Sequence, residues 1–101
     1  MARMSVEIPH GLTKADALSR IQQLLPRVKQ EQAERVNDLT ENWNGETCDF
    51  GFTALGGMKI SGKLIVGNAT VKLDGEIPWV LLAFKGIIER TIREQAEKLL
   101  R

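Results

Sequence analysis

The stretch CDFGFTALGGMKISGKLIVGNATVKLDGEI, residues 48–77, alternates apolar and polar side chains in three successive rows. The first row spans residues 48–54, the second residues 58–66 and the third residues 71–77, with glycine-containing turns between them. Alternation with a period of two is typical of strands that bury one face and expose the other to solvent. The stretch therefore predicts an antiparallel meander that covers a core on one side.

Two more strands are expected outside this stretch. Asn44-Gly45 is a strong two-residue hairpin turn, because both residues tolerate positive φ, so residues 39–43 are expected to form a further strand before the first row. Residues 4–8 alternate in the same way and predict a short N-terminal strand that ends at Pro9. The sequence thus predicts a four-stranded meander and a separate N-terminal strand.

Helical segments flank the meander. A long helix is expected after Thr13, a good N-cap, with the apolar stripe Leu18, Ile21, Leu25, Val28, Val36 and Leu39. Pro26 cannot donate to the carbonyl of Gln22, so a kink or a split is expected near it. Pro78 is expected to begin the C-terminal helix, which covers the sheet with Val80, Leu81, Phe84, Ile87, Ile88, Ile92 and Leu99.

These elements indicate an α+β fold with one core, and residues 1–101 have the length of a single domain. The expected order is a short strand, a long helix kinked near Pro26, a four-stranded antiparallel meander and a C-terminal helix packed on the sheet. If the sheet curves around the long helix, the arrangement is a reduced helix-grip fold.

The charge and cysteine content exclude several classes of protein. Fourteen basic and thirteen acidic residues leave a net charge of +1, which does not favour binding to nucleic acid. Cys48 is the only cysteine, so an internal disulfide is excluded and a reducing compartment is expected. The chain has neither a signal-peptide segment nor an apolar run long enough for a membrane span, and a cytoplasmic location is expected.

The sequence offers no constellation of catalytic or metal-binding residues. One histidine and one cysteine on different elements cannot supply a metal site, and no cofactor is expected. Cys48 shares the face of Phe50, where a cysteine acts as a small core residue. His10 is expected to bond local backbone in its turn rather than to act as a base. We therefore expect a protein that is not an enzyme.

Four residues remain as candidates for contacts beyond folding. Trp79 and Leu82 fall about half a turn from the expected core stripe, so they can anchor a partner or an apolar surface. Alternatively, the first helix or the strand with Trp43 covers them, or they form a homodimer interface. Gly62 and Gly75 lie on the apolar face of the meander, where a missing side chain makes a bulge, a bend, or room for an apolar ligand.

Three segments carry a family resemblance: Pro9-His10-Gly11-Leu12-Thr13 before the long helix, Gly62-Lys63-Leu64-Ile65-Val66, and the helix from Leu82 to Leu99. Over nearly its whole length the chain resembles the polyhydroxyalkanoic acid system protein family, small bacterial proteins found with polyhydroxyalkanoate granule systems. The resemblance implies an accessory or binding protein at the granule surface or on granule proteins, with no catalytic residues to carry over. The alternative is a small carrier of an apolar ligand in a helix-grip cavity.

Overall fold

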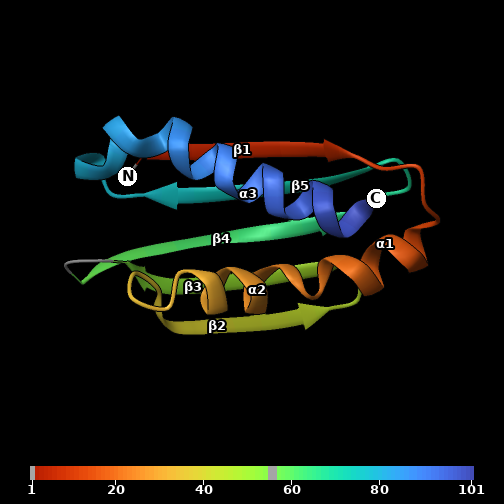
Figure 1. Cartoon of the computed structure of the whole chain (residues 1–101), viewed down its shortest axis with the longest axis horizontal. Helices are drawn as coiled ribbons and strands as arrows, with labels where there is room; N and C mark the ends of the chain where they lie inside the picture. The colour runs from red at the N-terminus through yellow and green to blue at the C-terminus, as the bar shows by residue number, and fades with distance from the viewer. Residues whose placement is uncertain (1, 55–56) are drawn as a thin grey trace.

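The computed structural model describes residues 2–54 and 57–101, and it shows one antiparallel sheet with its helices on one face (Figure 1). The elements follow in the order β1 (Ala2–Pro9), α1 (Lys14–Ile21), α2 (Leu24–Glu31), β2 (Asn37–Asn44), β3 (Thr47–Ala54), β4 (Met58–Val66), β5 (Thr70–Ile77), the 3-10 helix η1 (Trp79–Phe84) and α3 (Lys85–Leu100). The α+β class is therefore confirmed.

The sheet has five strands in the order β1-β5-β4-β3-β2. Strands β2 to β5 form the predicted meander, and β1 extends it by pairing antiparallel with β5 from Ala2 opposite Ile77 to Pro9 opposite Thr70. The N-terminal strand thus belongs to the same sheet as the four strands of the meander. The turn expected at Gly56-Gly57 begins in the connection 55–56, which lies outside the described residues.

The hairpin between β2 and β3 is displaced by one residue from the predicted turn. Asn44 pairs with Thr47, so the two loop residues are Gly45 and Glu46 rather than Asn44 and Gly45. Gly45 has a φ of 65°, the conformation that a two-residue turn with glycine in its first position requires. Asn44 is instead the last residue of β2, where positive φ is not needed.

The predicted long helix is in fact two helices. Thr13 caps α1 as expected, and its Oγ1 accepts a hydrogen bond from the Asp16 N–H at 3.1 Å. The break lies at residues 22–23, and Pro26 is the third residue of α2. Because the first-turn N–H groups of a helix have no partner within it, the proline fits there without a lost bond. The split expected near Pro26 therefore occurs just ahead of that residue.

The helical part of the chain is shorter than the expected apolar stripe. Helix α2 ends at Glu31, Val36 is buried ahead of β2, and Leu39 lies within β2. Asp38 has a φ of 54°, and the pairing of β2 with β3 is irregular between Asn37 and Thr40. The helix has already ended before these residues, because its C-cap Gln32 has a φ of −115° and a ψ of 36°, outside the α-helical region.

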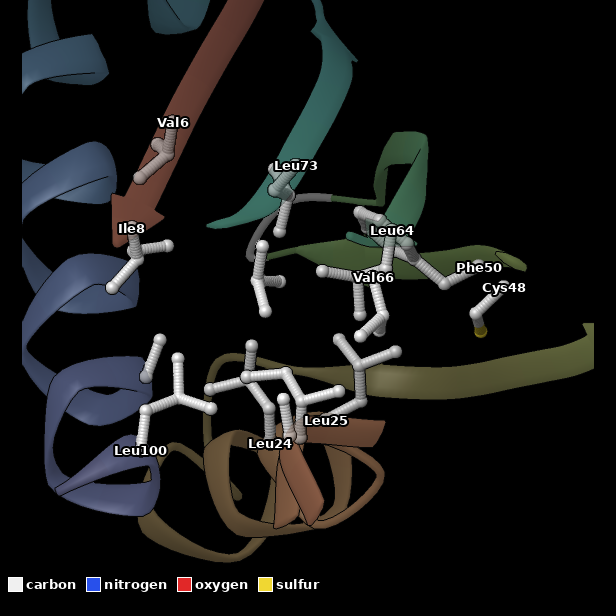
Figure 2. Packing of buried hydrophobic residues seen from close by; sticks show 14 of the residues in the cluster. Val6, Ile8, Leu24, Leu25, Cys48, Phe50, Leu64, Val66, Leu73 and Leu100 are labelled. Carbon is white, nitrogen blue, oxygen red and sulfur yellow. The ribbon is translucent and has the colours of Figure 1, made fainter. Parts of the chain in front are cut away.

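The core lies between the inner face of the sheet and the helices. Helix α3 packs on β1, while α1 contacts β4 and α2 contacts β2. In Figure 2, Leu24 and Leu25 of α2 and Leu100 of α3 point toward the strand residues Ile8 and Val66. A smaller cluster of Ala2, Ile60 and Ile77 lies apart from the main one. Alternation along the strands supplies the apolar side chains of both clusters.

The C-terminal helical segment differs from the predicted single helix. Pro78 precedes η1, a 3-10 helix of six residues, and α3 follows it directly. Of the expected core stripe, Leu81, Ile88, Ile92 and Leu99 pack against the two core clusters, whereas Val80, Phe84 and Ile87 face outward. The predicted packing of this segment is therefore wrong at three of seven positions.

Candidate apolar contact surface

Five large apolar side chains are exposed within nine consecutive residues. They are Trp79 with 66% of its surface exposed, Val80 with 69%, Leu82 with 47%, Phe84 with 52% and Ile87 with 54%. We call these five residues the apolar patch. Scattered exposed apolar residues are ordinary on a protein surface, but a contiguous group of this size is typical of a surface that contacts a partner.

The patch is exposed because η1 is held to the rest of the molecule by a single apolar side chain. None of the residues of η1 is buried, and only Leu81 packs against the cluster of Ala2, Ile60 and Ile77. Further along, α3 turns Ala96 and Leu100 into the core. The patch consequently lies at one end of an elongated molecule, at the start of the segment coloured light blue (Figure 1).

Trp79 and Leu82 both belong to this patch. The alternative in which α1 or the strand with Trp43 covers them is wrong, because both are exposed. Trp43 is half-buried against the main core, and its indole Nε1–H donates to Glu41 Oε1 at 3.3 Å.

Sequence reasoning missed three members of the patch, Val80, Phe84 and Ile87, because it placed them in the core. The run from Trp79 to Phe84 has no polar residue, so its pattern does not show which side is buried. The α-helical phase of the later core residues Ile88, Ile92 and Ala96 does not extend to this run, because residues 79–84 form a 3-10 helix.

The glycines on the apolar face of the meander provide close packing in this structure. A Cβ on Gly62 would clash with the Asp74 carbonyl oxygen and would lie 2.8 Å from Cζ of Phe50. One on Gly75 would meet Cε of Met4 and the Ser61 carbonyl oxygen, each at 3.4 Å. The Phe50 ring thus fills the inner side of Gly62, and the apolar-carrier hypothesis finds no support at this position.

An open hollow of about 420 Å³ does lie along these two glycines. Its other lining residues are mainly charged or polar side chains: Arg3, Asp49, Phe50, Ser61, Lys63, Asp74 and Glu76. Ion pairs cross this area, with Lys63 Nζ 3.7 Å from Asp49 Oδ1 and Arg3 Nη2 3.7 Å from Asp74 Oδ1. A shallow charged hollow of this kind does not suit an apolar molecule, which requires an enclosed apolar pocket.

The Pro9-His10-Gly11-Leu12 motif forms the junction between β1 and α1. His10 Nε2 lies 3.0 Å from the Gly67 carbonyl oxygen, and His10 Nδ1 accepts a hydrogen bond from the Leu12 N–H at 3.2 Å. The His10 N–H also donates to the Ala69 carbonyl oxygen at 2.9 Å. Both ring nitrogens are therefore engaged with backbone, and the ring joins the start of α1 to the β4–β5 turn, 57 residues away in the chain.

The described residues offer little for catalysis. Cys48 is fully buried, and burial raises the pKa of its thiol, so the nucleophilic thiolate is disfavoured. Within 2–54 and 57–101, no group of three or more His, Cys, Asp or Glu side chains is placed to hold a metal ion.

Comparisons with known proteins identify a family for this chain. No helix in the described part of the chain has both the length and the apolar character needed to cross a bilayer. No curated protein matches the sequence. The sequence model of one family, described as "Putative polyhydroxyalkanoic acid system protein", matches residues 4–100. Since that match covers nearly the whole chain, the protein belongs to the polyhydroxyalkanoic acid system protein family.

Proposed function

We propose that this protein is a non-enzymatic accessory protein that attaches to the surface of polyhydroxyalkanoate granules through the apolar patch. The observation that carries the proposal is the exposure of five large apolar side chains in η1 and the first turn of α3. The family name suggests which surface the patch contacts, because it refers to polyhydroxyalkanoates, which are hydrophobic polyesters.

The shape of the patch favours an extended surface over a small ligand. The hollows beside Gly62, Pro26 and His10 do not include a patch residue. Small molecules bind in concave pockets that enclose most of their surface, whereas a projecting element can press into a flat apolar phase. The location of η1 at one end of the molecule leaves the sheet and the other helices clear of such a contact (Figure 1).

The size of the patch also fits surface attachment. With about half to two-thirds of each side chain exposed, the five residues present on the order of 500 Å² of apolar surface. A stable complex of two proteins buries about 800 Å² on each partner, so this patch alone is small for a stable homodimer. Transfer of this surface from water into an apolar phase contributes a favourable free energy on the order of 10 kcal/mol. The loss of translational and rotational freedom on association reduces this value.

Sedimentation with purified polyhydroxyalkanoate particles, stripped of other proteins, tests the proposal. The wild-type protein should sediment with the particles, while an unrelated protein of similar charge should stay in solution. The double variant Trp79→Ser, Leu82→Ser should bind at least tenfold more weakly, because both side chains lose their apolar transfer free energy. Circular dichroism confirms that the variant is folded.

Ile65→Ser is the matched control for this experiment. Ile65 is 38% exposed but belongs to the opposite, polar face of β4. Its replacement removes a comparable apolar side chain outside the patch and should leave binding unchanged. Equal binding by wild type and the Trp79, Leu82 variant would refute the proposed contact. Binding only to native granules that retain their proteins would identify a granule protein as the partner instead.

A further inference from the structure

Trp79 carries the one polar side-chain group in the run from Ile77 to Phe84, its indole N–H. An indole is a hydrogen-bond donor only, and the remaining side chains of the run neither donate nor accept hydrogen bonds. Ile87, the patch residue in α3, is purely apolar as well. The side chains of the patch therefore combine a broad apolar surface with a single donor and no acceptor.

The two tryptophans of the chain differ in how this donor is used. Trp43 is half-buried, and its Nε1–H donates to Glu41 Oε1 at 3.3 Å. Trp79 is 66% exposed, and no hydrogen bond joins its indole to another residue within 2–54 or 57–101. Buried indole N–H groups usually have a hydrogen-bond partner. When the patch leaves water, the partner of Trp79 has to come from the contacted surface or from water at its edge.

Apolar surfaces differ in what they offer to this donor. A hydrocarbon has no acceptor, so an indole N–H buried against it stays unpaired, which opposes binding. A polyester is apolar as a whole, yet each repeat carries an ester carbonyl oxygen, which accepts hydrogen bonds. An ester group contains no donor of its own. A patch with one donor and no side-chain acceptor is thus complementary to a polyester surface.

We propose that the Trp79 indole N–H donates a hydrogen bond to an ester carbonyl oxygen of the polymer, and that this bond makes the patch prefer polyester to hydrocarbon. The inference rests on the proposed function, because it concerns the same patch and the same polymer. Val80, Leu82, Phe84 and Ile87 contact either material equally well. Trp79 alone distinguishes the two, so it determines the specificity of the surface.

Sedimentation with two kinds of protein-free particles, polyhydroxyalkanoate and polyethylene, tests the proposal. Trp79→Phe keeps an aromatic ring but lacks the donor. Its affinity for polyester should fall about fivefold or more, because a hydrogen bond is lost, while its affinity for polyethylene should change less than about twofold. The measured quantity is the ratio of these two effects, which does not depend on how strongly each material binds the wild-type protein.

Phe84→Leu is the matched control. Phe84 is 52% exposed, and its replacement also reduces an aromatic side chain of the patch, but it removes no donor. Binding should weaken by the same small factor on both materials. Circular dichroism confirms that both variants are folded.

A second measurement removes the donor without changing the size of the ring. In a Trp43→Phe background, Trp79 is the only tryptophan of the chain. Biosynthetic incorporation of benzothienylalanine, the tryptophan analogue with sulfur in place of the N–H, then alters this position alone. The analogue should bind polyester about fivefold more weakly than the same protein with tryptophan, and polyethylene equally well.

The outcomes separate this inference from the proposed function. An equal effect of Trp79→Phe on both materials, or undiminished polyester binding by the analogue, would overturn the hydrogen bond and leave granule attachment intact. Water at the edge of the contact would then be the partner of the indole. If the wild-type protein does not bind polyester at all, the proposed function fails and this inference fails with it. A loss confined to polyester in both measurements would uphold the two together.

Discussion

His10 links two parts of the chain that are distant in sequence. Its ring contacts the backbone of Gly67 and of Leu12, and its own N–H bonds to Ala69. Because Nδ1 accepts from an N–H, the neutral ring carries its proton on Nε2, which then donates to the Gly67 carbonyl. The Pro9-His10-Gly11-Leu12 motif therefore has a structural role at this junction.

Replacing His10 with alanine should lower the free energy of unfolding by about 1–2 kcal/mol, since two side-chain hydrogen bonds at a half-buried site are lost. Asparagine should recover part of this loss, because its side-chain oxygen can still accept from the Leu12 N–H. Urea unfolding of the three proteins provides the measurement. A His10→Ala protein as stable as wild type would contradict the structural role.

Gly62 is required by the close approach of β4 and β5. Gly62→Ala should destabilise the protein by about 2–3 kcal/mol, because the new methyl group would clash with the backbone of Asp74 and Gly75 and with the Phe50 ring. Gly75→Ala is the matched control, since its methyl group would meet its nearest atoms at 3.4 Å and should cost much less. Thermal unfolding compares the two variants. Equal stability of wild type and Gly62→Ala would instead indicate free space beside β4.

At the scale of elements, the free edge of β1 is partly closed. The His10 N–H donates to the Ala69 carbonyl oxygen. In the antiparallel register of β1 and β5, the even-numbered residues of β1 therefore direct their backbone N–H and C=O groups toward β5. Odd-numbered residues therefore turn their backbone groups to the open edge. There Pro9 lacks an N–H, and Arg93 Nη1 donates to the Glu7 carbonyl oxygen at 2.9 Å. Such features discourage pairing with the edge of another sheet.

Arg93 also connects α3 to β1, the strand on which α3 packs. Arg93→Ala should cost about 1 kcal/mol of stability and should speed hydrogen exchange at the amides of α3, because a charge-assisted bond between helix and strand is lost. Arg90→Ala is the control, since Arg90 is exposed and has no hydrogen bond or ion pair with other described residues. Identical exchange in the two variants would show that Arg93 does not hold the helix in place.

The same elements show which parts of the fold a sequence can predict. The alternation of residues 48–77 and the Thr13 cap depend on neighbouring residues, and both were predicted correctly. Helix α2 ends at Glu31, where Gln32 leaves the helical region, and neither a glycine nor a proline marks this point in the sequence. The buried side of residues 79–84 depends on contacts with β1 and β4, whose residues are far away in the sequence. Non-local contacts of this kind leave no local pattern.

The apolar patch, too, was predictable from the sequence only in part. Trp79 and Leu82 were identified from their helical phase, and the structure places them at the surface. Val80, Phe84 and Ile87 were assigned to the core because apolar residues are usually buried, and nothing within residues 79–84 contradicts that assignment. In the folded chain these three side chains are exposed instead of packed on the inner face of the sheet.

At the scale of the whole molecule, the near-neutral charge and the apolar patch together determine how binding should respond to salt. Basic and acidic residues almost balance, at fourteen and thirteen, so long-range attraction to a charged surface is weak. Attachment by the patch should therefore change less than twofold between about 0.05 and 0.5 M sodium chloride, a range over which screening suppresses interactions between exposed charges. Sodium sulfate should strengthen binding, because it favours the burial of apolar surface.

The measurement is the fraction of protein that sediments with polyester particles across this series of salt concentrations. The Trp79→Ser, Leu82→Ser variant should show weak binding at every concentration, since its charges are unchanged while its apolar surface is reduced. If wild-type binding instead falls steeply as sodium chloride rises, charged side chains carry the attachment. The exposed basic residues of α3, Arg90, Arg93 and Lys98, would then replace the apolar patch as the site to test.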